Sequence, residues 1–388
     1  MACKIAIPKS EFQKRWATLR EKMAEANLDV LIAHGDEADA SMARYLSDYW
    51  PLFETAGVAI GREGDPIQLI GPETLTFAKD RSKCPHIMQL LEYREPAEPE
   101  FPGMELATFE DVIAQASGGK EVKRIGIAGM PVMPVTVYDA LKKARGKARL
   151  IRADDLIVDM RTVKSKNELK CMKEAYRISE IATEYVLNNI KPGMTERQVV
   201  GLAQAALYEN GAEYEGHPTY VLSGKNSTHA IGRPSDKKIK EGELIQLNIG
   251  ALISGYSSSC GRPICIGKMP AKMRDLVSFG LEAHYKTGEL MKAGEPAAEV
   301  VLKYEQFVKD SGYEKFLLYG PCHSIGLMEV ERPWMERTSK FPLAENMTFQ
   351  VDTFFQTKSF GLRWENGLRV TKTGIEWLSG KFNDIIEL

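Results

Sequence analysis

The stretch LIQLNIGALISGYSSSCGRP, residues 244–263, constrains the fold of this chain more than any other. Its two runs of β-forming residues flank a turn at Gly255, which predicts a β-hairpin. Asn248 and Ser259 lie eleven positions apart on the two arms of this hairpin. Both are well placed to hold something between two strands, and neither carries a charge. The stretch therefore predicts a sheet with small neutral polar side chains at a potential binding position.

The length of 388 residues is too great for one small core and suits two domains. Residues 1–158 alternate helix and strand signals, which predicts an α/β domain. Residues 159–388 begin with a long helical stretch and continue with strand signals that two helical segments interrupt. We expect an α+β domain there, with helices outside a curved antiparallel sheet.

The composition excludes several classes of partner. The net charge of −2 offers no basic surface for nucleic acid or an anionic membrane. No run of eighteen apolar residues predicts a membrane span, and the charged N-terminus does not resemble an export signal. The six cysteines are scattered without a CxxC pair, which is typical of free thiols. We therefore expect a cytoplasmic protein that binds neither nucleic acid nor a membrane.

Three residues with chemically active side chains lie in predicted strands or at strand ends of the second domain. They are His323 in GPCHSIGL, Asp352 in FQVDTFF and Glu365 in LRWENGL. A charge in the middle of an apolar strand is costly unless it is paired or bound to a ligand. Each one alone is explained by a structural ion pair. The three together on one sheet favour a functional site.

The motifs IKPGMTE, SGKNSTHAIGRPSDKKIKEGELIQLNIGALISGY, GPCHSIGL, NMTFQVD and GLRWENGLRVT carry a resemblance. In their order and spacing, residues 153–388 resemble the pita-bread family of creatinase, prolidase, and methionine and proline aminopeptidases. The N-terminal α/β domain is similar to the first domain of creatinase and prolidase. The resemblance implies a two-domain chain with a pita-bread C-terminal domain, in which helices cover a curved antiparallel sheet.

The peptidases of this family bind two divalent metals through Asp, Asp, His, Glu and Glu. The matching positions here are Asn248, Ser259, His323, Asp352 and Glu365. Two cations a few ångströms apart need bridging carboxylates to offset their repulsion, and an amide and a hydroxyl are neutral. The resemblance therefore implies that this chain lacks the dinuclear metal centre.

Two histidines of the family are also replaced. Their positions fall on Ile231 and Val330, whereas the peptidases use these histidines to bind substrate and move protons. His229, two residues before Ile231, is a candidate replacement, and an ordinary surface histidine is an equally good interpretation.

Creatinase is the precedent for a member without the metal set, and it binds a guanidinium on carboxylates. Three tryptophans, Trp364, Trp334 and Trp50, fall at positions that the family places near its substrate. Indole faces beside carboxylates suit a cationic group; core packing is the alternative interpretation for each ring. In creatinase-like dimers the loop around Trp50 and Phe53 reaches the partner's site, so the resemblance implies a homodimer.

Three hypotheses follow. The first is a metal-independent, cofactor-free hydrolase of a C–N bond in a small cationic or zwitterionic compound. Asp352 and Glu365 would bind the cation, and His323 and His229 would move protons. Asn248 and Ser259 would bind substrate or water. The second hypothesis is a dipeptidase-like hydrolase with one metal on His323, Asp352 and Glu365. The third is a binding protein of this fold without catalysis.

Overall fold

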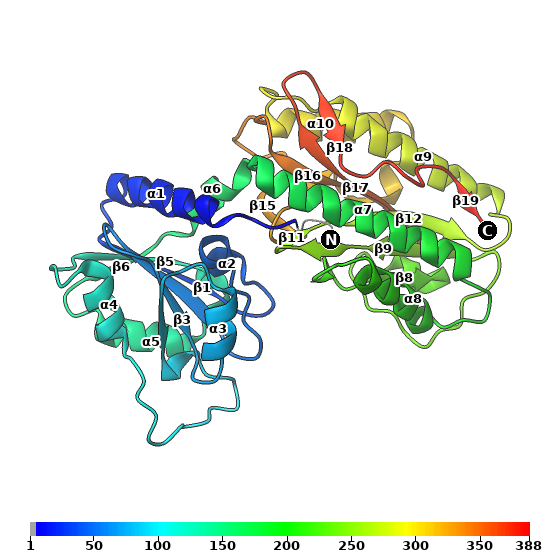
Figure 1. Cartoon of the computed structure of the whole chain (residues 1–388). Helices are drawn as coiled ribbons and strands as arrows, with labels where there is room; N and C mark the ends of the chain where they lie inside the picture. The colour runs from blue at the N-terminus through cyan, green and yellow to red at the C-terminus, as the bar shows by residue number, and fades with distance from the viewer. Residues whose placement is uncertain (1–4) are drawn as a thin grey trace. The chain divides into compact units, whose positions relative to one another are not determined.

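The computed structural model describes residues 5–388 and divides them into two compact units (Figure 1). One unit comprises residues 7–161, and the other comprises Ile5, Ala6 and residues 162–388. The two units meet after Arg161, and the first residues described belong with the C-terminal unit. No helix in residues 5–388 combines the length and apolarity that a membrane span requires.

The N-terminal unit contains a mixed six-stranded sheet in the order β4-β3-β2-β1-β5-β6. Strand β1 is antiparallel to β2 and parallel to β5. Its strands are β1 (Val30–Gly35), β2 (Ala56–Gly61), β3 (Ile67–Ile70), β4 (His86–Gln89), β5 (Arg124–Ala128) and β6 (Arg149–Arg152). The α-helices are α1 (Lys9–Glu25), α2 (Ser41–Ser47), α3 (Leu75–Arg81), α4 (Phe109–Ser117), α5 (Val135–Ala144) and α6 (Asp154–Thr162), with 3-10 turns η1 (Leu91–Tyr93) and η2 (Met130–Val132).

The C-terminal unit contains a larger, almost wholly antiparallel sheet in the order β15-β14-β16-β17-β12-β9-β8. Strands β13, β18 and β19 pair with β16, β17 and β12. The ten strands are β8 (Tyr220–Ser223), β9 (Leu244–Ile249), β12 (Cys260–Cys265), β13 (Leu317–Tyr319), β14 (Cys322–Ser324), β15 (Glu331–Trp334), β16 (Thr348–Gln356), β17 (Gly361–Val370), β18 (Ile375–Trp377) and β19 (Ile386–Glu387). A small sheet contains β7 (Tyr214–Glu215), β10 (Ala251–Ile253) and β11 (Tyr256–Ser257).

Helices lie on this sheet as the sequence predicts (Figure 1). They are α7 (Lys166–Asn189), α8 (Glu196–Glu209), α9 (Ala271–Glu289) and α10 (Ala297–Asp310), with 3-10 turns η3 (Gly224–Thr228) and η4 (Glu314–Phe316). Ser165 and Thr195 begin α7 and α8 with capping boxes, which satisfy otherwise unpaired backbone N–H groups. The expected fold class, an α/β domain followed by a helix-covered antiparallel pita-bread domain, is confirmed.

The predicted hairpin is present, with β9 and β12 antiparallel and Asn248 opposite Gly261. The turn between them includes Ser254 and Gly255, whose φ angles are 49° and 82°. Glycine adopts such a left-handed conformation at little cost, which explains the residue at this position. Ser259 lies directly before β12 and so returns the chain toward Asn248.

Candidate functional site

Strands β16 and β17 place opposite residues of the site beside each other. Their antiparallel register pairs Asp352 with Glu365 and Thr353 with Trp364. Because side chains alternate between the two faces of a strand, Asp352 and Glu365 share one face. Trp364 lies on the other face, fully buried with the residues of α9, and donates its indole N–H to Val277 O at 2.9 Å. The prediction that Trp364 contacts substrate is therefore wrong, because the alternation turns it toward the core.

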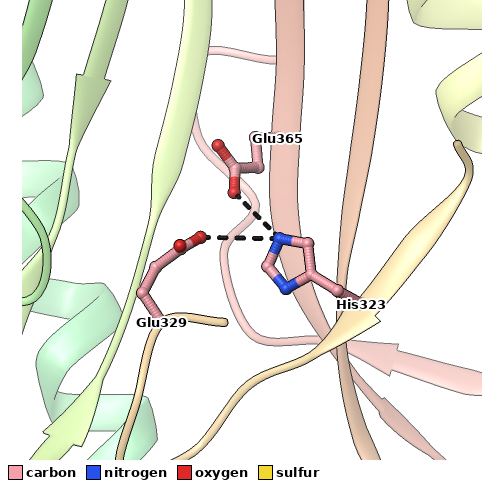
Figure 2. A group of neighbouring side chains, drawn as sticks. All are labelled: His323, Glu329 and Glu365. Carbon is pink, nitrogen blue, oxygen red and sulfur yellow. Dashed lines mark ion pairs between the residues drawn. The ribbon is translucent and has the colours of Figure 1, made fainter. Parts of the chain in front are cut away.

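His323, Glu329 and Glu365 form the central cluster of the candidate site (Figure 2). The Nε2 atom of His323 lies 3.6 Å from a carboxylate oxygen of Glu329 and 4.0 Å from Oε1 of Glu365. One ligand atom from each residue lies within 4.8 Å of the other two. His323 and Glu365 are buried, and Glu329 is partly buried. The three side chains thus converge on one small volume, as Figure 2 shows.

The hydrogen bond at the other ring nitrogen assigns the tautomer of His323. Its Nδ1 lies 3.1 Å from Ser324 O, and a carbonyl oxygen only accepts hydrogen bonds. Nδ1 therefore carries the proton, and in the neutral ring the Nε2 lone pair faces Glu329 and Glu365. A backbone carbonyl that orients a histidine in this way is typical of metal-ligating imidazoles.

The two glutamates resist ionisation in this environment. Burial, and then the charges of Asp352 and Glu329, raise the pKa of Glu365 to about 8, although Arg363 and His323 oppose the shift. Burial also raises the pKa of Glu329 to about 7. Within residues 5–388, Glu365 Oε1 is a buried acceptor that receives no hydrogen bond. The cluster consequently needs a proton or a bound cation to offset its negative charge.

The donor set fits a single divalent cation. One imidazole nitrogen and two carboxylate oxygens are ligands that zinc, manganese or cobalt accept, with further positions left for water or substrate. The unpartnered Oε1 of Glu365 points to the same conclusion. Asn248 donates its amide N–H to Glu365 Oε2 and receives the Ser259 hydroxyl at 2.9 Å, so these two positions offer neutral groups in place of carboxylates that could bridge two cations.

Asp352 lies next to this cluster but has other partners. Tyr319 donates its hydroxyl to Asp352 Oδ2 at 2.7 Å, and Arg363 Nε lies 3.4 Å from Oδ1. Asp352 is not among the three residues of the cluster. The group that could hold one metal therefore contains Glu329 where the sequence suggested Asp352. Glu329 was missed because it lies before β15, outside the strands; its position between the apolar residues Met328 and Val330 is the only sequence signal.

Arg363 is a buried cation within the same face. Its Nη2 donates to Ala230 O at 2.6 Å and to Tyr319 OH at 2.7 Å, and its Nη1 lies 3.7 Å from Glu365. Burial alone would lower the pKa of Arg363, but Asp352, Tyr319 and Glu365 outweigh it and raise the pKa. Arg363 thus offsets part of the carboxylate charge permanently. The residues that the sequence suggested for the site did not include Arg363.

His217 also reaches the site and was likewise missed. It lies between β7 and β8, and its Nε2 lies 3.0 Å from Ser259 Oγ. Ser259 in turn contacts Asn248, which contacts Glu365. Asn248 and Ser259 therefore connect His217 to the cluster.

The remaining residues that the sequence suggested for the site are distributed over both units of the chain. The Trp334 ring stacks on His323, with centroids 5.3 Å apart, and is 40% exposed. His229 is exposed, and it forms backbone hydrogen bonds: its N–H donates to Asn226 O, and its carbonyl accepts from Gln246. In the N-terminal unit, Trp50 donates its indole N–H to Glu37 O at 3.0 Å, and Phe53 is 71% exposed.

Comparisons with known proteins agree with this architecture. Residues 170–372, more than half of the chain, match the model of metallopeptidase family M24. Residues 15–163 match the creatinase/prolidase N-terminal domain. The structure of an X-Pro aminopeptidase from Thermotoga maritima superposes with a TM-score of 0.84 over 96% of this chain and 99% of that one, at 24% identity. This likeness supports the fold.

Curated relatives include two Xaa-Pro dipeptidases. The protein from Pyrococcus horikoshii is 29% identical over 266 residues, which cover 68% of this chain and 75% of the relative. The protein from Pyrococcus furiosus is 27% identical over 283 residues, covering 73% and 80%.

Proposed function

The chain belongs to metallopeptidase family M24, and on this basis we propose that it is a hydrolase of a C–N bond in a dipeptide-like substrate. We further propose that it works with one divalent cation, held by His323, Glu329 and Glu365. Relatives named Xaa-Pro dipeptidase support the substrate class. The replacement of two ligand positions by Asn248 and Ser259 separates this chain from a dinuclear enzyme.

The observation that carries this proposal is the convergence of His323 Nε2 and two carboxylates within 4.8 Å. Like charges at this distance in a buried site oppose folding unless something positive lies between them. Arg363 is bonded to Ala230 and Tyr319, so its guanidinium is held to one side of the cluster. A divalent cation would satisfy all three ligands at once.

The cation, when bound, would polarise a substrate carbonyl and lower the pKa of a water molecule. The chain's own residues supply the surroundings. Burial and the charge of Asp352 raise the pKa of Tyr319, so its hydroxyl keeps its proton and continues to donate to Asp352. The Nδ1 bond to Ser324 O keeps the His323 ring oriented toward the glutamates.

Exposed apolar side chains beside the cluster favour an apolar substrate group. Ile231 is 87% exposed and follows Ala230, the acceptor of the Arg363 bond. Val330 is exposed and follows Glu329, and Trp334 stacks on His323. Apolar surface of this kind suits a proline ring or an aliphatic side chain better than a charged one.

A second candidate is a metal-independent hydrolase of a small cationic or zwitterionic compound, the interpretation that the sequence alone favoured. One observation supports it: the carboxylates of Glu329 and Glu365 converge within 4.8 Å, a pair to which a guanidinium or ammonium group would bind in place of a metal. Trp334 would then offer a ring face to that group.

Metal titration combined with a substrate panel separates the two candidates. Protein freed of metal by a chelator is titrated with Mn²⁺, Co²⁺ or Zn²⁺ in a calorimeter. It is then assayed on Xaa-Pro dipeptides, other dipeptides and guanidino compounds. We expect one equivalent of cation to bind and hydrolysis of dipeptides to require it. Turnover of a guanidino compound without cation would favour the second candidate, and no turnover of either class would contradict both.

A further inference from the structure

A chain of hydrogen bonds leads from His217 to the carboxylate of Glu365. His217 Nδ1 lies 2.9 Å from Pro218 O, and its Nε2 lies 3.0 Å from Ser259 Oγ. Ser259 Oγ lies 2.9 Å from Asn248 Oδ1, and the Asn248 amide nitrogen donates to Glu365 Oε2. Ser259 and Asn248 are buried, so these bonds are not readily replaced by water.

When His217 is neutral, this series of hydrogen bonds has one donated hydrogen fewer than it has contacts. Glu365 Oε2 accepts from the Asn248 amide nitrogen, and it remains an acceptor when the carboxyl proton is on Oε1, so Asn248 Oδ1 faces Ser259. Pro218 O also accepts only, which assigns a proton to His217 Nδ1. The hydroxyl of Ser259 has one hydrogen, and two acceptors face it: Asn248 Oδ1 and the bare Nε2 of a neutral His217.

Protonation of His217 removes this conflict. Nε2–H then donates to Ser259 Oγ, and the Ser259 hydroxyl donates to Asn248 Oδ1. Each hydrogen bond from His217 through Ser259 and Asn248 to Glu365 then has one donor and one acceptor. In the neutral state the Ser259 hydrogen can turn to Nε2, and Asn248 Oδ1 loses its donor, which is costly for a buried group.

We propose that His217 is a positioning residue of this site, whose protonation state sets the direction of the Ser259 hydroxyl and thereby the hold of Asn248 on Glu365. The proposal rests on the proposed function only for its effect on catalysis. The hydrogen-bond coupling itself concerns the folded protein without substrate or metal.

The surroundings of His217 support this role. A Cβ at Gly250 would lie 2.8 Å from the ring, so glycine leaves the space that the imidazole fills. Burial lowers the pKa of His217 and Arg363 lowers it further, whereas Glu365 and Glu215 raise it. The ring edge also meets Tyr220, with centroids 5.7 Å apart. The net effect is a lowered pKa, so His217 gains its second proton only as the pH falls below the ordinary range of a histidine.

No other histidine of the chain has this position. The remaining five are His34 and His86 in the N-terminal unit, His284 stacked on Trp377, the exposed His229, and His323 in the cluster.

Nuclear magnetic resonance tests the coupling without any assay of activity. The Cε1–H resonance of His217 reports its protonation, and the side-chain amide of Asn248 reports the state of its carbonyl. In the parent protein both should titrate with one midpoint. In Ser259→Ala, His217 should still titrate while the response of Asn248 at that midpoint is lost. The side-chain amide of Asn226, which donates to Glu196, is the internal control. An Asn248 response that is missing in the parent, or unchanged in Ser259→Ala, would overturn the proposal.

Kinetics test the consequence for the reaction. The ratio of kcat/KM between the parent and His217→Gln should change with pH along the titration of His217, because glutamine donates to Ser259 but does not titrate. The same ratio for Ser259→Ala should follow the same curve. Ratios that are constant with pH would indicate a merely structural histidine and would contradict the proposal. If the protein hydrolyses no dipeptide, the proposed function fails and the resonance experiment still decides the coupling.

Discussion

Glu329 holds a carboxylate oxygen 3.6 Å from Nε2 of His323, although neither the strand pattern nor the family's ligand positions pointed to it. Glu329 lies before β15, in the connection that follows β14. This connection returns a carboxylate to a cluster whose hairpin positions, Asn248 and Ser259, are neutral. The relationship changes the expected ligand set and leads directly to the first prediction.

Glu329→Gln should weaken binding of the single divalent cation by about 100-fold or more. Loss of a residue that only hydrogen-bonds to a metal ligand already weakens metal binding by up to about 100-fold, and Glu329 is proposed to be a ligand itself. Asp352→Asn is the matched control and should have a smaller effect, because Asp352 is bonded to Tyr319 and Arg363. Calorimetric titration of both variants checks this order. A larger loss in Asp352→Asn would return Asp352 to the ligand set.

The double variant Asn248→Asp, Ser259→Asp should bind a second equivalent of cation. Two carboxylates on the hairpin would restore the charge that bridging between two cations needs. Each single variant should remain at one equivalent, because one added carboxylate supplies only half of that charge. Metal analysis after dialysis measures the stoichiometry, and one equivalent in the double variant would show that more than charge is missing.

Stability of the metal-free protein should fall as the pH rises from about 5 to about 8. The pKa values of Glu329 and Glu365, about 7 and about 8, lie above the ordinary value of 4.5. The folded chain therefore keeps protons that the unfolded chain has released in this window. The stabilisation that these retained protons give is complete below the ordinary pKa of 4.5, and it is lost as the pH rises past the raised pKa values. Glu365→Gln should flatten the dependence. Urea unfolding with a chelator present measures it, and a rise in stability over this range would contradict the assignment.

Trp364→Ala should cost about 3–5 kcal/mol of unfolding free energy, the usual range for removing a fully buried aromatic ring. Trp334→Ala should cost about 1 kcal/mol, because that ring is partly exposed and mainly loses its stacking on His323. Substrate affinity should respond in the opposite order, with the larger loss in Trp334→Ala. Chemical denaturation and KM measurements on both variants test this contrast. Equal effects on KM would argue against Trp334 as a substrate contact.

The chain should form a homodimer through the loop that carries Leu52 and Phe53. These two apolar side chains are 51% and 71% exposed in the single chain, a patch that favours contact with another surface. Replacing both with serine should shift the protein to a monomer without lowering its unfolding free energy. Light scattering at micromolar concentration checks the oligomeric state, and a monomeric parent protein would refute the expectation.

Local sequence patterns were sufficient to predict much of the secondary structure and fold of this molecule. The hairpin of residues 244–263 was predictable because β-rich runs and a glycine turn are properties of neighbouring residues. The order of elements predicted the two folds, and charged residues in apolar strands pointed to Asp352 and Glu365. The same reasoning was wrong for Trp364, because membership of a strand does not say which face lies against α9.

The sequence by itself therefore determined the two folds, the strands that carry Asp352 and Glu365, and the loss of charge at Asn248 and Ser259. Only the tertiary structure decided which side chains meet: Glu329 with His323, Arg363 with Asp352, and His217 with Ser259. Secondary structure follows from interactions over a few residues, which a sequence displays directly. A site depends on strand register and on loops that return from distant parts of the chain, and these are settled by packing of the whole domain.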